Sequence, residues 1–253
     1  MFSWANRLRQ HTARLVVHTG DLLFPPHCLC CDTELHDTLN RRLCGFCSER
    51  VAPIVWNGCR RCGTRMPGLV APTCRCLACR RLSLHFDAAV PLGAYHEGLD
   101  ELILRMKKPS QQAVSIALAQ LLAQRRHDRL RECRADLIVP IPMFWIRRLR
   151  RGVNNPDVLA DVLGRSLKVP SQTNVLVQRR RTRPQHHLPR SYRFENMRDA
   201  FKVQRPEAVR NHRVLLVDDV LTTGATCSEA AKVLKRAGAT AVWVAVIART
   251  QND

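Results

Sequence analysis

The sequence lacks any long apolar run, and this absence argues against an integral membrane protein. Nowhere do about 18 apolar residues follow one another, so we expect no membrane-spanning helix. The longest apolar run near the N-terminus covers residues 15–17, which is too short for the core of a secretory signal peptide. The spacing of Trp4, Leu8 and Leu15 fits a short amphipathic helix instead. We therefore expect a cytoplasmic protein.

Acidic residues are also scarce. The chain has 21 Asp and Glu against 41 Lys and Arg, which gives a formal net charge of +20. Such an excess favours a polyanionic partner, because each neutralised phosphate releases condensed counterions. A GC-rich genome would explain the preference for arginine over lysine, but it would not explain the net charge. We expect a nucleic-acid partner.

The segment from residue 28 to residue 79 has few large apolar side chains but contains ten of the twelve cysteines. Two C-x-x-C turns can surround one zinc ion with four thiolates. We expect one or two structural zinc ions here, and zinc binding would supply much of the folding free energy of the segment. The simplest pairing is sequential, with a first cage of Cys28, Cys31, Cys44 and Cys47 and a second cage of Cys59, Cys62, Cys76 and Cys79.

Alternatives stay open for these cysteines. Iron–sulfur ligation would use the same thiolates. Cys30 and Cys74 are left over by the sequential pairing, and Cys74 could replace Cys76 as a ligand. A disulfide framework is not expected in a chain without signs of secretion. The isolated Cys133 and Cys227 are expected to be small buried residues.

From residue 86 onward, strands alternate with helices. Apolar patterning predicts strands over residues 86–95, 136–142, 174–178, 213–218 and 240–248, with a break at residues 91–93. It predicts helices over residues 99–106, 111–131 and 225–236, and one that follows Asn155 as N-cap with Pro156 in its first position. This alternation requires crossovers and a mainly parallel sheet. We expect two domains: residues 1–85, an N-terminal helix with a double C-x-x-C zinc-binding region, and residues 86–253, an α/β domain.

A phosphate site is predicted where the strand over residues 213–218 leads into a helix. Ligands of open α/β sheets bind at the carboxyl ends of the strands. There, two acids precede a loop of hydroxyl residues and glycine, over residues 221–226. Backbone N–H groups, hydroxyls and the helix N-terminus can hold a phosphate, and Gly224 allows a close approach of the backbone. Asp218 and Asp219 can accept hydrogen bonds from ribose hydroxyls and lie near Mg²⁺.

Residues 214–226 resemble the phosphoribosyl pyrophosphate signature of type I phosphoribosyltransferases. The resemblance implies that Asp218 and Asp219 bind the ribose 2′ and 3′ hydroxyls. It implies a mainly parallel five-stranded sheet with flanking helices and a hood. The cysteine pairs predict a small four-cysteine zinc-ribbon-like domain before it. The resemblance also implies that the 5′-phosphate is held by Thr222, Thr223, Gly224, Ala225 and Thr226.

The cysteine pairs and further segments make nearly the whole chain similar to the ComF family of competence-associated proteins. The chain departs from the family at residues 153–156, where Phe-Asn-Gln is more common. That departure puts in doubt a role for a glutamine there, but not the fold. The further similar segments are Tyr95 with residues 98–107, residues 139–142, 148–152, 181–188 and 193–201, and the closing residues 248–249.

Two arginine clusters are predicted to contact phosphate, since guanidinium groups bind its oxygens in a bidentate manner. They are expected to hold the pyrophosphate of the donor or a DNA backbone, with a solvated surface as the alternative. His186, His187 and Tyr192 could stack on a base, although ordinary packing is the simpler explanation. The arginines in question are Arg147, Arg148, Arg150 and Arg151 in one cluster, and Arg179, Arg180, Arg181 and Arg183 in the other.

The resemblance implies a protein that binds phosphoribosyl pyrophosphate with Mg²⁺ and handles single-stranded DNA in natural competence, together with other competence proteins. The alternative is an active phosphoribosyltransferase of nucleotide metabolism or salvage with no DNA role. No catalytic residue and no acceptor base can be assigned from the sequence. A regulator of the repressor-like phosphoribosyltransferase kind ranks third.

Overall fold

A computed structural model describes residues 25–35, 42–66, 76, 79, 82–96, 98–144, 146, 149, 152–183, 188, 189 and 191–251. Contacts between Cα atoms divide the chain into two compact units, Met1–Ser48 and Glu49–Asp253. The boundary expected at residue 85 therefore falls inside the larger unit. The amphipathic helix expected near Trp4 lies outside the described residues. Within the described part of the chain, no helix is long and apolar enough to cross a membrane.

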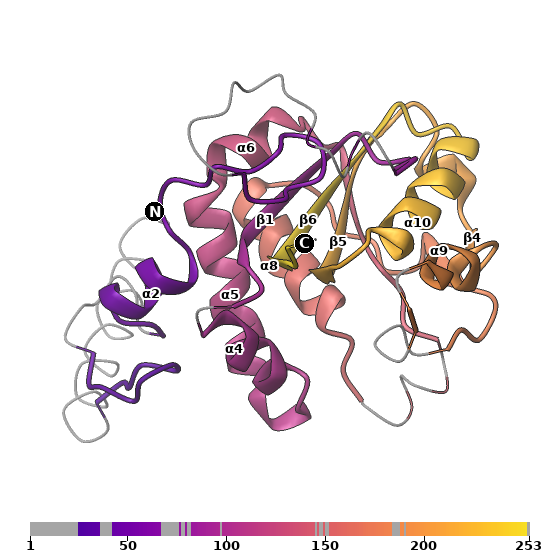
Figure 1. The fold of residues 1–253 in the computed structure, drawn as a ribbon. Helices are drawn as coiled ribbons and strands as arrows, with labels where there is room; N and C mark the ends of the chain where they lie inside the picture. Colours follow the sequence, from indigo (N-terminus) through magenta and orange to yellow (C-terminus); the bar gives the residue numbers. More distant parts are fainter. Residues whose placement is uncertain are drawn as a thin grey trace, which may run out of the picture. The chain divides into compact units, whose positions relative to one another are not determined.

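A four-stranded parallel sheet forms the centre of the larger unit (Figure 1). Its strands stand in the order β1 (Ala88–Ala94), β6 (Ala241–Arg249), β5 (Arg213–Leu221) and β2 (Leu137–Pro140). The sheet therefore has four strands and not the expected five, and beside β2 the described residues add a single bridge between Ile138 and Ser171. The segment expected as a strand at residues 174–178 forms β3 (Leu176–Gln178), but β3 pairs antiparallel with β4 (Phe201–Val203), outside the main sheet.

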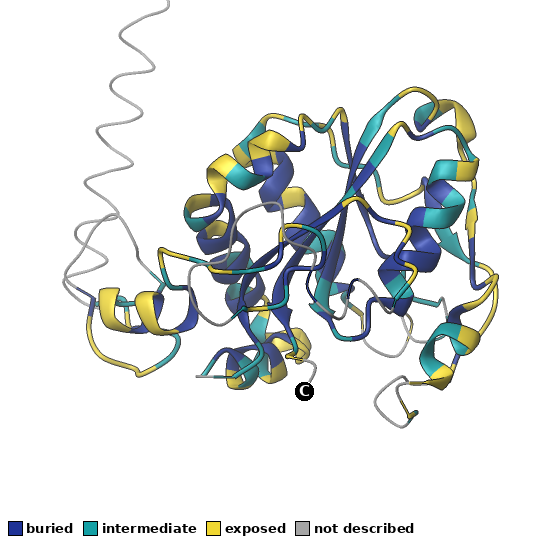
Figure 2. Ribbon diagram, turned by 45° about the horizontal axis from the view of Figure 1, so that its top comes forward, coloured by how far each residue is buried: buried dark blue, intermediate teal, exposed yellow. Residues whose placement is uncertain are grey.

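Helices cover both faces of this sheet, and the strands are buried along most of their length (Figure 2). One face packs against α4 (Leu99–Met106), α5 (Gln112–Arg125) and α8 (Asn155–Leu167). The other packs against α10 (Ala225–Arg236) and the β3–β4 pair, with α9 (Tyr192–Met197) beside α10. Shorter elements are α2 (Gly45–Val51), α6 (His127–Glu132), and the 3-10 turns η1 (Pro109–Gln111) and η3 (Pro206–Ala208).

β1 continues through Pro91, where the sequence predicted a break. The strand pairs with β6 from Ala88 to Ala94, and Pro91 stands opposite Val246. Proline has no N–H to donate, so it is tolerated where one side of a strand needs no ladder bond. β1 stands at the edge of the sheet, so one of its sides needs no ladder bond.

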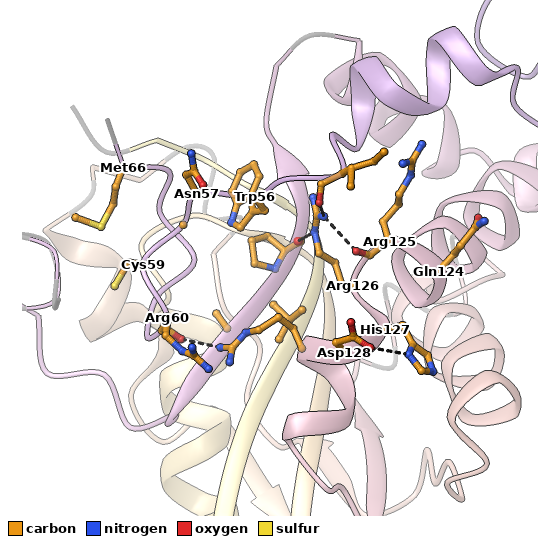
Figure 3. A pocket seen from close by; sticks show the side chains of 16 residues that line it. Trp56, Asn57, Cys59, Arg60, Met66, Gln124, Arg125, Arg126, His127 and Asp128 are labelled. Atoms are coloured by element: carbon orange, nitrogen blue, oxygen red, sulfur yellow. Dashed lines mark hydrogen bonds and ion pairs between the residues drawn. The ribbon is translucent and has the colours of Figure 1, made fainter. Parts of the chain in front are cut away.

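The helix expected over residues 111–131 is broken at Arg126 into α5 and α6. The side chain of Arg126 is 5 % exposed and lies 5.8 Å from the ring of Trp56 (Figure 3). A buried guanidinium must satisfy its donors, and here backbone carbonyls do so. The helix breaks at the residue whose side chain bonds to three segments, residues 53–54, residues 91–92 and the end of α5. Its acceptors are the carbonyl oxygens of Pro53, Ile54, Pro91, Leu92 and Arg125.

The N-cap of α8 is Asn154, one residue earlier than expected. The side-chain amide of Asn154 is buried and donates hydrogen bonds to the carbonyl oxygen of Ile141 at 3.2 Å and to Oδ1 of Asp157 at 2.7 Å. Pro156 is the second residue of α8 and not, as predicted, the first, but it still lies in the first turn. Asn154 thereby fixes the start of α8 to the segment that leaves β2.

Candidate functional site

The predicted phosphate loop, residues 221–226, connects β5 to α10. β5 does not end at Asp218, as we expected, but continues to Leu221. The reason is its neighbour β6, because Asp218, Val220 and Leu221 stand opposite Val246, Ala248 and Arg249. The two acids are therefore held in the last part of a strand, and the free loop is limited to residues 222–224.

Gly224 is required at the start of α10. Its backbone is left-handed, with φ of 85°, a conformation that is costly for residues with a Cβ. A Cβ at this position would also lie 3.1 Å from Cδ2 of Leu84 and 3.5 Å from Cε1 of Phe86. The loop is thus packed against the segment that follows the second pair of C-x-x-C motifs.

Asp218 is an unusually buried acid. Burial is the main cause that raises the pKa of Asp218 well above its ordinary value, and the neighbouring carboxylate of Asp219 adds to it. Cys227, also buried, directs its Sγ at Oδ2 of Asp218 over 3.6 Å. The backbone N–H of Asp219 donates to Oδ1 of Asp218 at 2.9 Å, which opposes the shift. Ionisation of this carboxyl is therefore more costly in the ligand-free protein than in water.

The two acids line a cavity of about 520 Å³. Its walls come from the ends of β5, β2 and β1, from α8 and from the β3–β4 pair. The lining combines two acids, Asp218 and Asp219, with two cations, Lys107 and Arg183. The lining also includes Tyr95, Asn154, Gln178, Met197, Phe201, Thr222, Thr226 and Thr250.

The structure gathers part of the predicted site at this cavity. Asp218, Asp219, Thr222, Thr226 and Arg183 line it. Three loop residues are buried behind it, namely Thr223, Gly224 and Ala225. Thr223 is 7 % exposed, and its Oγ1 accepts a hydrogen bond from the N–H of Ala225 at 3.4 Å.

The other predicted side chains are placed elsewhere or lie outside the description. Arg179, Arg180 and Arg181 are exposed and Tyr192 is 58 % exposed, and none of these four residues lines the cavity. Arg183 reaches it although β3 belongs to the antiparallel pair and not, as we assumed, to the parallel sheet. The remaining predicted contacts lie outside the described residues: Arg147, Arg148, Arg150, Arg151, His186 and His187.

Lys107 is a lining residue that the sequence argument did not assign. It is the C-cap of α4. It is one of only six lysines in a chain whose other 35 basic residues are arginines. The rarity of lysine could have marked this residue as a candidate. Asn154, Gln178 and Phe201 carried no comparable signal, because ordinary polar and aromatic residues reach the cavity only through the fold.

Arg249, at the end of β6, is 2 % exposed and contacts the phosphate loop directly. Its Nη1 donates to the carbonyl oxygens of Leu221 and Thr250, each at 2.9 Å, and to that of Thr222. Its Nε donates to the carbonyl oxygen of Cys62 at 2.9 Å. One side chain therefore joins the loop to a cysteine of the second cage.

The eight cysteines of the predicted cages gather in the predicted groups. In each group, all four Sγ atoms lie within 4.8 Å of one another. Thiolates about 2.3 Å from a tetrahedral zinc ion would be about 3.8 Å apart. The Sγ atoms of Cys31 and Cys44 are 3.8 Å apart, and those of Cys59 and Cys79 are 3.7 Å apart. Both groups can thus hold a zinc ion.

The two cages begin with the same backbone turn. In the first, the N–H of Cys28 bonds to the carbonyl oxygen of Thr33 at 2.8 Å; in the second, Cys59 bonds to Thr64 at the same distance. The next step is also shared, since Asp32 and Gly63 have positive φ and donate back to the first cysteine. The two turns are thus equivalent, and each directs its two thiols inward.

Backbone N–H groups also direct hydrogen bonds at a sulfur of the first cage. The N–H groups of Cys30 and Cys44 direct hydrogen bonds at Sγ of Cys28, at 3.5 and 3.3 Å. Such donors stabilise negative charge on sulfur, which a metal ligand requires. Cys30 is outside the cage but adjoins it through this bond. Cys74, the other leftover cysteine, lies outside the described residues.

A second cavity, of about 430 Å³, lies beside the edge of β1 (Figure 3). Its lining includes Trp56, Arg125, Arg126 and Arg129. These arginines already have partners, since Arg125 pairs with Glu49 at 3.1 Å and Arg129 with Glu132. These ion pairs engage the arginines in contacts within the protein. The cavity beside Asp218 is therefore the better candidate for a ligand site.

Comparison with known proteins places this geometry in context. The family described as Phosphoribosyl transferase domain matches residues 111–253. The chain is 31 % identical to Competence protein F of Haemophilus influenzae over 226 residues, which are 88 % of this chain and 96 % of that protein. It is 31 % identical to the DNA utilization protein YhgH of Escherichia coli K12, over 82 % of this chain and 97 % of that one. An adenine phosphoribosyltransferase of Maricaulis maris is 37 % identical over 73 residues, or 29 % of this chain and 42 % of that enzyme.

Replacing Gly224 by alanine should destabilise the protein more than the same change at Gly152. Both glycines have positive φ, which costs an alanine about 1–2 kcal/mol. A Cβ at Gly152 meets nothing within 4 Å, whereas at Gly224 it crowds Leu84, which adds about 1 kcal/mol or more. Urea unfolding of the two variants measures the difference. Equal losses would show that the packing of Leu84 on the loop is unimportant.

Replacing Asp218 by asparagine should stabilise the ligand-free protein at neutral pH but not in acid. The raised pKa means that the folded state prefers the protonated carboxyl. The resulting stability is present below the unfolded pKa of about 3.9 and is lost as pH rises through the folded pKa. The free energy of unfolding of the variant relative to that of the wild type should therefore grow as pH rises from 4 through the folded pKa, and then level off. A difference that does not change with pH would contradict this account.

Proposed function

The chain belongs to the ComF family, and we propose that it binds phosphoribosyl pyrophosphate, or a related phosphoribosyl ligand, with Mg²⁺ and handles single-stranded DNA in natural competence. The fold is that of a type I phosphoribosyltransferase, with a four-stranded parallel sheet. In the proposal, the cavity beside Asp218 takes the ligand, the cysteine cages hold structural zinc, and the protein acts in the cytoplasm.

The observation that carries the proposal is the charge pattern of this cavity. Asp218 and Asp219 provide acceptors, while Lys107 and Arg183 provide positive charge in the same space of about 520 Å³. A ribose with phosphates has hydroxyl donors near its ring and negative charge at its ends. The cavity and this class of ligand are thus complementary.

Each part of the ligand has a proposed partner. The hydroxyls of Thr222 and Thr226, with the backbone behind them, hold the 5′-phosphate at the N-terminus of α10. Asp218 and Asp219 accept hydrogen bonds from the ribose hydroxyls. Lys107 and Arg183 bind the pyrophosphate. Mg²⁺, bound with the ligand, would neutralise phosphate charge.

The proposed DNA role rests on charge and on the relatives. The chain carries a net charge of +20, which two zinc ions held by eight thiolates would lower to about +16. Relatives that match most of the chain are named for competence and DNA utilization. We propose that the arginine clusters at residues 147–151 and 179–183 contact the phosphates of a single strand, with other competence proteins as partners.

An alternative function is phosphoribosyl transfer to a base in nucleotide metabolism, without a DNA role. Gln178, Met197 and Phe201 line the cavity and would give a base one amide and an apolar wall. Release of pyrophosphate on addition of a particular base would favour this alternative. We assign no catalytic residue, because no described side chain of the lining is placed for a defined proton transfer.

Asp218→Asn combined with Asp219→Asn should abolish binding of phosphoribosyl pyrophosphate with Mg²⁺, because both carboxyl groups proposed to bind the ribose hydroxyls are lost. Calorimetric titration of the zinc-loaded protein is the measurement, and micromolar binding is expected for the wild type. Asp161→Asn is the control, since Asp161 is an exposed acid of α8 that pairs with Arg165. Unchanged affinity in the double variant would remove the two acids from the site.

Replacing Arg147, Arg148, Arg150 and Arg151 by alanine should weaken the binding of single-stranded DNA. It should also lower the slope of log affinity against log salt by roughly 0.7 to 1 for each phosphate that the variant no longer binds. Fluorescence anisotropy with a labelled oligonucleotide at several salt concentrations gives this slope.

A charge-matched control separates direct binding from net charge in that experiment. It replaces four exposed arginines elsewhere by alanine, namely Arg165, Arg205, Arg210 and Arg236. The slope should then stay close to the wild-type value. Equal changes in both variants would mean that the first cluster does not bind DNA specifically.

A further inference from the structure

The second cysteine cage is built into the wall behind the phosphate loop. Cys59, Cys62, Cys76 and Cys79 share one buried core with Leu221, Ala225 and Cys227 of the loop and α10, a set to which Leu84 and Phe86 also belong. A structural zinc site that served only its own segment would not need this position. Because of this packing, a change in the cage can alter the shape of the loop.

Arg249 is the most direct link between them. Its Nε bonds to the carbonyl oxygen of Cys62, and its Nη1 bonds to those of Leu221 and Thr222. The side chain is 2 % exposed, so water cannot take the place of a missing acceptor. Moving either the cysteine turn or the loop would leave a buried guanidinium donor unsatisfied, which is costly.

A second link runs through residues 82–86, which follow the last cysteine of the cage. Nη2 of Arg61, inside the Cys59–Cys62 turn, donates to the carbonyl oxygen of Leu84 at 2.8 Å. Leu84 packs against Gly224. The N–H of His85 donates to Oγ of Ser228, in the first turn of α10, at 3.0 Å.

The charge of the zinc-filled cage is opposite to that of Arg249. Four thiolates around a zinc ion carry a net charge of about −2. The guanidinium of Arg249 lies between that cage and the loop that would receive a phosphate. A filled cage therefore stabilises the buried cation, and the cation holds the carbonyl oxygens of Leu221 and Thr222 toward itself.

We propose that metal occupancy of the second cage and binding of the phosphoribosyl ligand are coupled, and that Arg249 is the positioning residue that couples them. The zinc-filled cage holds the loop in its binding shape, and loss of the metal frees the loop and weakens ligand binding. Linkage requires the reverse as well, so the bound ligand raises the affinity of the cage for zinc by the same factor. The ligand part of this inference rests on the proposed function above.

The test uses the full chain with Cys28→Ser and Cys31→Ser, so that zinc is held only by the second cage. Its zinc affinity is measured by competition with a zinc-selective chelator, with and without phosphoribosyl pyrophosphate and Mg²⁺. We expect the ligand to raise this affinity by at least about five-fold. Adding Arg249→Gln should remove the effect of the ligand while the folded protein still binds zinc.

Arg126→Gln is the matched control. Arg126 is also buried, and its guanidinium is also held by backbone carbonyls, but at β1 and away from the loop. The coupling should persist in this variant. If Arg249→Gln keeps the full ligand effect, or if Arg126→Gln loses it equally, the role of Arg249 is overturned.

A ligand-free measurement separates this inference from the proposed function. Hydrogen exchange of the amides of residues 221–226 should rise by about five-fold or more when zinc is removed, and also in zinc-loaded Arg249→Gln. If no phosphoribosyl ligand binds the parent protein, the proposed function fails but this arm still decides the link between cage and loop. Unchanged exchange in both cases would overturn the link. If Arg249→Gln does not fold, Arg249→Lys replaces it, because one ammonium keeps the charge but cannot span both sets of carbonyls.

Discussion

A guanidinium buried at the end of β6 sets the constraint on which the larger unit depends. Arg249 needs acceptors on opposite sides, and it finds them in the phosphate loop, in the C-terminal segment and in the second cysteine cage. Three stretches that are distant in sequence must therefore keep one arrangement. The charge on the side chain makes this arrangement stricter than apolar packing would, because an unpaired buried donor is more costly than a small void.

The same part of the molecule holds the carboxyl group of Asp218 in a buried position that disfavours its charged form. The pairing of β5 with β6 continues beyond Asp218, so that this carboxyl is held in a strand and cannot turn out to water. Its raised pKa is the consequence of that confinement. Strain of this kind is common at ligand sites, since the group that a ligand satisfies is poorly satisfied without it.

Sequence patterning predicted the features whose causes are local. The grouping of eight cysteines followed from two-residue spacing, because each C-x-x-C turn directs two thiols to one point. The acids, the hydroxyl loop and Gly224 could be found in one short stretch for the same reason. The ends of α4 were predicted to the residue from the spacing of Leu99, Leu102, Ile103 and Met106.

Other features depend on partners that sequence spacing does not reveal. The break at Arg126, the passage of β1 through Pro91 and the extension of β5 to Leu221 each follow from a neighbour in space. Lys107 and Gln178 reach the cavity only because α4 and the β3–β4 pair end near it. The sequence by itself determined which chemical groups stand together in each short motif. Only the tertiary structure decided that the second cage lies behind the phosphate loop, because a buried charge takes its acceptors from whichever segments the fold brings to it.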